Sequence, residues 1–454
     1  MTTDLARVYE LIDQHADDHL ELLGELVRKP SRTGLLDEVR QCADFLVGLL
    51  TSSGWRAEAV PVDGLAPVVF AERPAPGAER SVLLYSHYDV ISPEPVDAWT
   101  YPPFAATRVD GRIIGRGTTD AKANVLALIK AVDTLAEVAG EPPCTVKLIL
   151  DGDEERGSPS LPLFMDRFES SLVADAALSL DGGIDPSGVP KIGLGTSGML
   201  YIELACQGAP RELHSAAARL FVNPAWRLVW ALASIKAPDE RMLVDGFDRD
   251  VAPPSERDLE LLDAMPWDDQ RQLDEAGVSS FLTGVRGTAA ARRLLFEPGL
   301  AICGLTSGYS GPGPKAVIPD RAVAKLEFRI VPNQAPERVV DLLRRHLDRQ
   351  GFDDVTIEVL ATVETAKTDP DAAIVAAAIE GARRFYGEPM VKPTEEYAGR
   401  QGAWLGRRLG IPGVQTGIGP PGHRGHAADE FVTEEHFITG IKLVATILDR
   451  FGNT

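Results

Sequence analysis

The chain has 454 residues, and its 46 Lys and Arg residues against 67 Asp and Glu residues give a formal net charge of −21 at pH 7. Hydrophobic residues make up 44% and charged residues 25%, which excludes bulk disorder and, at about 150 residues per domain, allows two or three domains. Nucleic acid is not expected as the main partner of so acidic a chain, because phosphate binding needs a basic surface.

Cysteine usage and hydropathy predict where the protein resides. The four cysteines are far apart and form no Cys-x-x-Cys pair, which indicates a reducing compartment. Residues 1–10 carry charges and lack the apolar stretch of a signal peptide. No apolar run approaches the ~18 residues of a membrane span. We therefore expect a cytoplasmic protein without a membrane partner.

The first part of the chain predicts alternating helices and strands. Apolar residues at helical spacing predict one helix over residues 5–28 and another over 37–53. Short apolar runs of strand length follow, with a helix expected over 123–138 between the first two. The runs are 81–85, 145–150, 176–180 and 413–416. Strands that alternate with helices predict a mostly parallel α/β sheet.

The middle of the chain predicts a second, inserted domain. Strands and helices are expected in alternation over 199–206, 223–235, 322–330, 336–349 and 355–360. This order is typical of a small α+β domain of the split βαβ, or ferredoxin-like, type. A charged and proline-rich stretch, 245–298, interrupts it. Helices are then expected over 372–386 and 434–451. We predict an α/β domain of residues 1–194 and 368–454, interrupted by an α+β domain of residues 195–367.

Acidic residues and histidines follow the predicted strands of the α/β domain. In an open parallel sheet the carboxyl ends of the strands form one ligand-binding edge, so these side chains are expected to meet there. Imidazoles together with carboxylates favour a divalent metal, zinc first, with manganese or cobalt also possible. The residues are His87, Asp120, Glu154, Glu155, Asp181 and His426.

Each of these residues also has an ordinary structural interpretation. Asp120 and Asp181 precede a helix or a turn and could be helix N-caps. A single histidine is most often exposed or hydrogen-bonded, and we expect the histidines of charge-rich helical stretches to be solvated. Those are His15, His19, His346 and His436. The loop histidines leave His87 and one of His423 or His426 as expected ligands.

The adjacent residues Glu154 and Glu155 are predicted to have two different roles. Neighbouring side chains of an extended loop cannot point the same way, so one can bind a metal while the other takes a proton from a metal-activated water. The alternative is a solvated acidic turn. The position of the pair at the end of a strand favours the catalytic interpretation over the solvated turn.

Four motifs together resemble the co-catalytic di-zinc peptidase family, which includes aminoacylase and acetylornithine deacetylase. They are Ser86–Val90, Gly115–Lys122, Asp153–Ser158 and His426–Glu430. The carnosinase and cytosolic dipeptidase branch looks most similar, through Trp99–Phe104, Leu213–Ser215, Asn223–Trp226 and Val317–Pro319. The resemblance covers nearly the whole chain. It implies an α/β catalytic domain with an inserted lid that also forms a homodimer.

The resemblance implies a role for each ligand residue. His87 and Asp181 would bind one metal ion, Glu155 and His426 the other, and Asp120 would bridge them. The cofactors would be two divalent ions per subunit.

Further roles follow from the same resemblance. Asp89 would fix the tautomer of His87, and Glu154 would be the general base. His214 would reach from the lid of the partner subunit to the substrate carbonyl oxygen, and Arg329 would hold the free carboxylate of the substrate.

One segment departs from the pattern of this branch. Residues 397–402 replace a glycine-rich segment that normally helps to hold the substrate, and they introduce Arg400. A guanidinium prefers an anionic partner, so Arg400 is a candidate substrate-binding residue. The alternative is that Arg400 faces solvent.

These observations predict a metal-dependent hydrolase that cleaves the amide bond of a dipeptide, or of a related small substrate with a free carboxylate. A deacylase of N-acyl amino acids, or a specialised amide hydrolase of secondary metabolism, is the first alternative. The second is a catalytically silent binding protein, whose mark would be loss of Glu154 or of a metal ligand. All of those residues are present.

Overall fold

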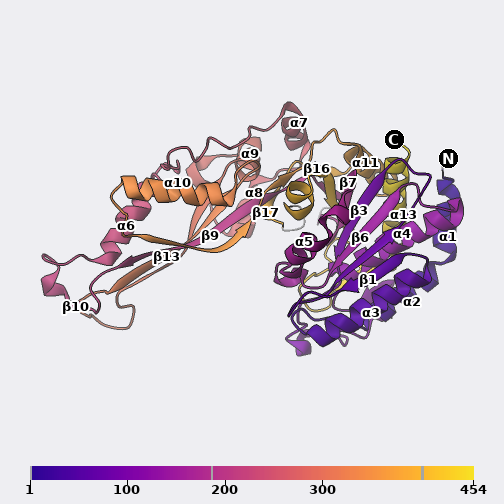
Figure 1. The fold of residues 1–454 in the computed structure, drawn as a ribbon, viewed down its shortest axis with the longest axis horizontal. Helices are drawn as coiled ribbons and strands as arrows, with labels where there is room; N and C mark the ends of the chain where they lie inside the picture. Colours follow the sequence, from indigo (N-terminus) through magenta and orange to yellow (C-terminus); the bar gives the residue numbers. More distant parts are fainter. Residues whose placement is uncertain (1–2, 186–187, 400–402) are drawn as a thin grey trace. The chain divides into compact units, whose positions relative to one another are not determined.

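The computed structural model describes residues 3–185, 188–399 and 403–454. The chain divides into two compact units (Figure 1). The first unit comprises Met1–Gly195, Lys367–Pro393 and Arg400–Thr454, and the second comprises Thr196–Ala366 and Thr394–Gly399. Among the described residues, no helix has both the length and the apolar character needed to cross a membrane.

The first unit contains an eight-stranded sheet of order β1-β2-β6-β3-β7-β18-β8-β16. Its strands are β1 (Arg56–Val60), β2 (Val68–Arg73), β3 (Ser81–His87), β6 (Thr145–Asp151), β7 (Ala176–Leu180), β8 (Lys191–Gly193), β16 (Met390–Lys392) and β18 (Gly413–Thr416). The central strands β6, β3, β7 and β18 run parallel to one another. Antiparallel pairing joins β2 to β6 and β18 to β8. The mostly parallel sheet confirms the predicted fold class.

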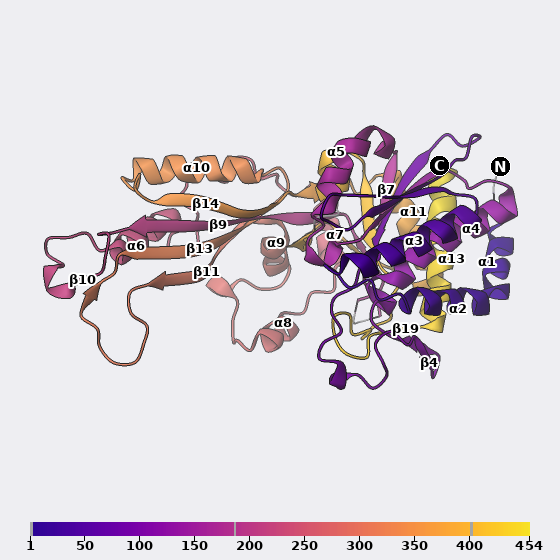
Figure 2. The same ribbon diagram turned by 60° about the horizontal axis from the view of Figure 1, so that its bottom comes forward.

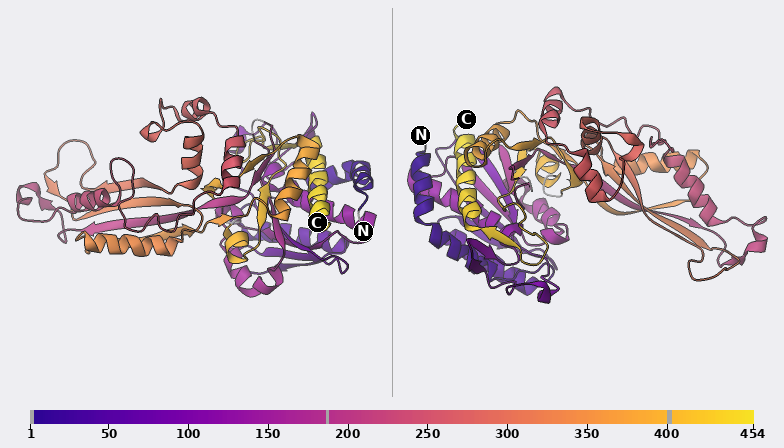
Figure 3. Two further views of the ribbon diagram at one scale, coloured as in Figure 1. Left: turned by 90° about the horizontal axis from the view of Figure 1, so that it is seen from above. Right: turned by 180° about the vertical axis from the view of Figure 1, so that it is seen from behind.

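Helices cover this sheet because its inner strands are apolar on both faces. The helices are α1 (Leu5–Gln14), α2 (Ala16–Val27), α3 (Leu36–Ser52), α4 (Ala123–Ala139), α5 (Ser160–Leu172), α11 (Ala373–Tyr386) and α13 (Glu434–Gly452). Phe164 of α5 forms one buried cluster with Phe70, Leu83, Tyr85 and Ile149 of the sheet. Helix α1, near the start of the chain, packs on α13, near its end (Figure 3). The hydroxyl oxygens of Tyr9 and Thr446 lie 2.7 Å apart.

The single helix expected over residues 5–28 is wrong. Helix α1 ends at Gln14 and α2 begins at Ala16, and His15 between them has φ −99° and ψ 16°, outside the helical range. The acidic residues Asp17 and Asp18 lie in the first turn of α2, where they favour a new N-terminus. The apolar periodicity continues across the break, which is why the pattern alone did not reveal it.

The second unit contains a sheet of order β11-β13-β9-β14, whose four main strands are all antiparallel to their neighbours. The strands are β9 (Gly195–Gln207), β11 (Gly299–Ser307), β13 (Arg321–Ile330) and β14 (Thr356–Val363), with β15 (Ala366–Lys367) and β17 (Glu395–Ala398) also paired to β9. Helices α6 (Pro224–Ile235) and α10 (Pro336–Arg349) pack on this sheet, and Figure 2 shows α10 lying along it. The core beneath them includes alternate residues of β9 and β13, namely Leu200, Ile202, Leu204, Leu326 and Phe328.

The stretch expected as an excursion contains three short helices. They are α7 (Glu256–Ala264), α8 (Asp269–Ala276) and α9 (Thr288–Phe296). Strand β11, which follows α9, was not predicted from the sequence. It is an edge strand, and most of its residues are exposed or half-buried on both faces, so it lacks the alternation that marks a strand with one buried face.

Candidate metal centre

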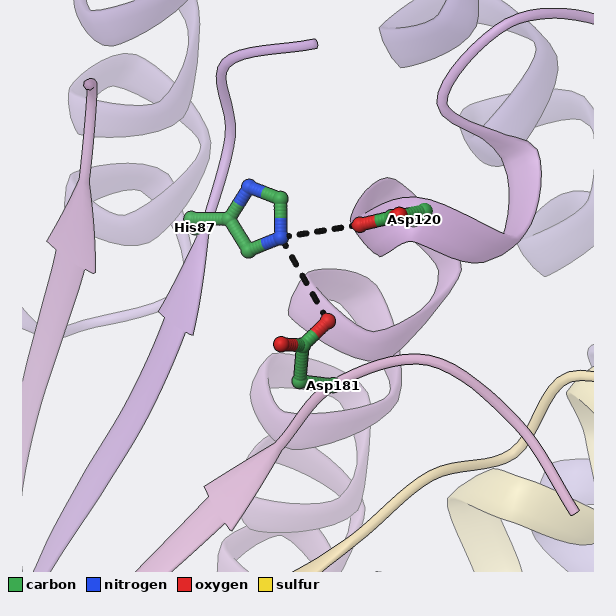
Figure 4. A group of neighbouring side chains, drawn as sticks. All are labelled: His87, Asp120 and Asp181. Atoms are coloured by element: carbon green, nitrogen blue, oxygen red, sulfur yellow. Dashed lines mark ion pairs between the residues drawn. The ribbon is translucent and has the colours of Figure 1, made fainter. Parts of the chain in front are cut away.

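Three side chains meet at the carboxyl edge of the first unit's sheet (Figure 4). His87 is the last residue of β3, Asp181 directly follows the neighbouring parallel strand β7, and Asp120 lies in the turn before α4. Nε2 of His87 lies 3.1 Å from Oδ1 of Asp120 and 3.4 Å from Oδ1 of Asp181. Each residue offers one ligand atom, and these atoms lie within 4.8 Å of one another.

A second group of three shares Asp120 with the first. Nε2 of His426 lies 3.0 Å from Oδ2 of Asp120 and 3.0 Å from Oε2 of Glu155. Glu155 is in the turn after β6, and His426 is in the loop between β18 and β19 (Phe431–Thr433). Asp120 therefore presents one carboxylate oxygen to each group, which is the arrangement a bridging ligand needs.

The chemistry of this donor set fits divalent cations. Nε2 of His87 is buried and makes no hydrogen bond, although it faces two carboxylates. Burial lowers the pKa of His87, but Asp120, Asp181 and Asp89 outweigh it and raise the pKa well above its usual value. Hydrogen bonds to Asp120 and Glu155 raise the pKa of His426 to about 10. The negative field that favours protonated imidazoles also attracts divalent ions.

Asp89 connects the loops that carry His87 and the two glutamates. Its Oδ1 lies 3.4 Å from Nδ1 of His87, and its backbone oxygen lies 3.2 Å from the same atom. Its carboxylate accepts hydrogen bonds from the backbone N–H groups of Glu154, at 3.1 Å, and Glu155, at 3.2 Å. One buried carboxylate thus orients both an imidazole and the turn after β6.

Glu154 has the properties of a proton acceptor. Burial is the largest cause of a raised pKa, the charge of His87 opposes it, and Asp181 and Asp151 add to it, so that the pKa of Glu154 is about 8. A carboxyl group whose pKa lies near neutrality can both take and return a proton. Glu154 is absent from both groups of metal-ligand atoms found among the described residues.

The helix N-cap interpretation of the aspartates is wrong. The N-cap of α4 is Lys122, and no side chain caps that helix end. Asp181 follows β7, and the next regular element in the described part of the chain is the strand β8, so no helix of that part begins beside Asp181.

The structure distinguishes the two loop histidines. Nδ1 of His423 accepts a hydrogen bond from the N–H of Gly425 at 3.0 Å, so the proton of a neutral ring is on Nε2. Neither nitrogen then offers a lone pair to a metal. Nε2 of His426 belongs to a ligand group, and that of His423 does not.

Sequence reasoning missed the part played by Glu430. Its fully buried carboxylate accepts hydrogen bonds from the backbone N–H groups of Gly117 at 3.0 Å, Thr119 at 2.9 Å and Asp120 at 3.0 Å. It also pairs with Nη1 of Arg116 at 2.5 Å. Glu430 therefore holds the turn that presents Asp120. Its place in the motif with His426 was the only sequence signal for it.

The other predicted site residues lie in the second unit or outside the described chain. His214 is exposed at the end of β10 (Leu213–His214), and its Nδ1 accepts a 3.1 Å hydrogen bond from Ala216 N–H. Nε of Arg329 lies 2.7 Å from Oε1 of Glu327. Arg329 also lines a cavity of about 290 Å³ in the second unit. Arg400 lies outside the described residues.

The sequence is similar to those of known metallopeptidases. A family model described as peptidase family M20/M25/M40 matches residues 83–450. The human Beta-Ala-His dipeptidase is 29% identical over 76% of this chain and 71% of its own length. A Cys-Gly metallodipeptidase of Schizosaccharomyces pombe is 28% identical over 77% of this chain and 76% of its own.

Solved structures share the fold. An M20 family metallo-carboxypeptidase from Sulfolobus solfataricus has a TM-score of 0.83 and 31% identity, and the match covers 96% of this chain and 99% of that one. Human carnosine dipeptidase 1 has a TM-score of 0.70 and 24% identity, with 99% of this chain and 100% of that one covered. The resemblance inferred from the motifs is confirmed.

Proposed function

Because the chain belongs to peptidase family M20/M25/M40, we propose that it is a dipeptidase that cleaves the amide bond of a small substrate with a free carboxylate. The observation that carries the proposal is the pair of ligand groups joined through Asp120, with Glu154 beside them but outside both. The dipeptidase names of the human and yeast relatives support the same substrate class.

Each residue of the centre has a part in the proposed reaction. His87 and Asp181 would hold one ion, Glu155 and His426 the other, and Asp120 both. We propose zinc, with manganese or cobalt as substitutes, because imidazole and carboxylate donors suit all three. When bound, the ions supply a water of lowered pKa and polarise the scissile carbonyl.

Glu154 would then handle the proton of the reaction. Its carboxylate takes the proton as the water oxygen bonds to the carbonyl carbon, and returns it to the leaving nitrogen as the C–N bond breaks. Asp89 keeps His87 and the backbone of Glu154 in place during these steps. In the second unit, Arg329 would pair with the substrate carboxylate and His214 of the partner subunit would contact the carbonyl oxygen.

A substrate screen tests the activity. Metal-supplied protein is assayed on neutral and acidic dipeptides, on longer peptides and on N-acyl amino acids. Glu154→Gln should lose activity by a factor of about 10² or more while it keeps both ions. Glu25→Gln, on the exposed face of α2, is the matched control. Hydrolysis of N-acyl amino acids alone would replace the dipeptidase proposal with a deacylase.

The metallo-carboxypeptidase from Sulfolobus solfataricus supports a second candidate function, since it is 31% identical over 96% of this chain. A carboxypeptidase also acts beside a free carboxylate but accepts longer peptides. Faster release of the last residue from a tripeptide than from the matching dipeptide would favour it.

We further propose that the protein is a cytoplasmic homodimer. An exposed apolar surface on the second unit supports dimerisation, and we name it the α6 surface: Leu220, Phe221, Val222, Trp226, Val229 and Trp230. The rings of Trp226 and Trp230 stack with their centroids 5.9 Å apart. An apolar surface of this kind is typical of a protein interface.

Mixing two inactive variants tests whether His214 acts across the dimer. A hybrid of His214→Ala with Glu154→Gln would contain one intact site, so random exchange should restore about a quarter of the normal site number. No recovery under conditions that exchange subunits would exclude the role of His214 in the partner's site.

A further inference from the structure

His423 is a second imidazole beside the metal centre, and neither ligand group uses it. A Cβ atom on Gly183, two residues after Asp181, would lie 2.8 Å from Cδ2 of the His423 ring. A Cβ atom on Gly425 would lie 3.1 Å from Cε1 of the same ring and 3.7 Å from Oδ2 of Asp120. The ring therefore packs closely on Gly183, in the loop that carries Asp181, and lies near Gly425 of its own loop, which also approaches Asp120.

The hydrogen bonding of His423 leaves one donor unused. Nδ1 accepts the 3.0 Å hydrogen bond from Gly425 N–H, so Nε2 of the neutral ring carries the proton. Nε2 makes no hydrogen bond to any part of the chain that the structure describes. It lies between Cδ2 and Cε1 on the ring edge, and the side chain is only half-buried, so a bound molecule can reach it.

A neutral N–H group fixed in this way cannot ligate a metal and cannot pair with an ammonium group. Its partner must be an acceptor, and the acceptor that gains charge at a hydrolytic centre is the carbonyl oxygen of the scissile amide. We propose that His423 donates a hydrogen bond from Nε2 to this oxygen as it becomes negative. The inference rests on the proposed function and adds a catalytic residue from the same unit as the metal ligands.

Two substitutions of His423 distinguish the effect of the Nε2 hydrogen-bond donor from the effect of the packing of the ring. His423→Asn can still accept the hydrogen bond from Gly425 N–H but cannot reach with a donor to the position of Nε2. His423→Gln can place an amide N–H near that position. We expect kcat of the Asn variant to fall by about 10²–10³, with KM nearly unchanged, and the Gln variant to recover much of the loss.

Binding provides a readout apart from turnover. A phosphinic dipeptide analogue carries tetrahedral, negatively charged oxygens in place of the amide carbonyl. The Asn variant should bind this analogue more weakly by a factor similar to its loss of kcat, whereas its affinity for a product amino acid should stay the same. Metal content is measured for every variant and should equal that of the wild type.

The controls distinguish failure of this inference from failure of the proposed function. Wild-type protein that hydrolyses no dipeptide would overturn the proposed function and the inference that rests on it. If the wild type is active, unchanged kcat and unchanged analogue binding in His423→Asn would overturn the role of His423 alone. Loss of metal, or equal impairment of the Asn and Gln variants, would show that His423 only supports the structure of the loops. Either result would also overturn the proposed role of His423 as a hydrogen-bond donor.

Discussion

Glu430 stabilises the metal centre without being one of its ligands. Its buried carboxylate accepts hydrogen bonds from three backbone N–H groups of the turn that presents Asp120, and it neutralises buried Arg116. The turn therefore depends on a charge that is supplied from the opposite end of the sequence.

We predict that Glu430→Gln weakens both folding and metal binding. An amide cannot neutralise Arg116, and leaving one partner of a buried ion pair alone costs about 3–5 kcal/mol of unfolding free energy. Chemical denaturation of metal-free protein and competition with a chromophoric chelator measure the two effects. Glu434→Gln is the control, because Glu434 pairs with the exposed Arg108 and should cost under about 1 kcal/mol. Equal losses in both variants would contradict the prediction.

The expectation that four helical histidines are solvated is wrong for two of them. His346 is 3% exposed, and its Nε2 lies 2.8 Å from the backbone oxygen of Ser234. Nε2 of His19 is buried without a hydrogen bond, in a cavity that Lys130 also lines. Charged neighbours in the sequence conceal burial when they lie on the opposite face of a helix.

His19 predicts a loss of stability in acid. Burial, together with the charge of Lys130, lowers its pKa from 6.5 to about 4. A lowered pKa in the folded state means that the stabilising contribution is complete above pH ~6.5 and is lost as pH falls towards ~4. We expect His19→Asn to remove about 1–3 kcal/mol of the pH dependence of the unfolding free energy, measured on metal-free protein at pH 7.5 and 4.5. The same pH dependence in both proteins would contradict this assignment.

At the scale of secondary structure, the sequence predicts best the elements that have one or two buried faces. The strands expected over 176–180 and 413–416 match β7 and β18, and the helix expected over 336–349 matches α10. The periodicity of these elements reflects contacts with a core. The exposed edge strand β11 and the helix break at His15 leave no such periodic signal.

The α6 surface, which belongs to a single helix and the residues before it, allows a prediction about dimerisation. Helix α6 buries Leu228, Ala231 and Ile235 against its own unit and exposes Trp226 and Trp230 on the other side. Trp230→Glu should dissociate the proposed dimer, because an interface core does not tolerate an unpaired charge. Sedimentation velocity measures the change. Val173→Glu, an exposed apolar position of the first unit, should leave the dimer intact.

At the scale of the molecule, the two units have separate cores, and the proposed metal ligands all belong to the first. We therefore expect two unfolding transitions in calorimetry. Zinc at about 100 times its Kd should stabilise the first unit by about 2.7 kcal/mol per site, and should raise its Tm by several degrees, without moving the other transition. Asp120→Ala should abolish the shift. A shift of both transitions would show that the units unfold together.

The site was less predictable from the sequence than the sheet. His87, Glu155 and Asp181 could be selected because each lies at or near the end of a predicted strand. The distances between these side chains depend on the order of the strands in the sheet. The hydrophobic periodicity of the sequence does not predict that order. The contacts of Glu430 join residues more than 300 positions apart, so no local pattern contains them.

The separation of Thr119 and Glu430 along the chain also affects when the metal centre can form during translation. Glu430 is synthesised 311 residues after the backbone amide of Thr119 that it binds, and His426 emerges just before it. At a synthesis rate of ~5–20 residues per second, about 15–60 s pass between the synthesis of the turn that contains Asp120 and that of Glu430 and His426. A ribosome-bound chain therefore holds an incomplete metal centre until His426 and Glu430 have emerged. The proposed peptide hydrolysis can begin only after that point, so a shorter nascent chain is inert towards the small peptides around it.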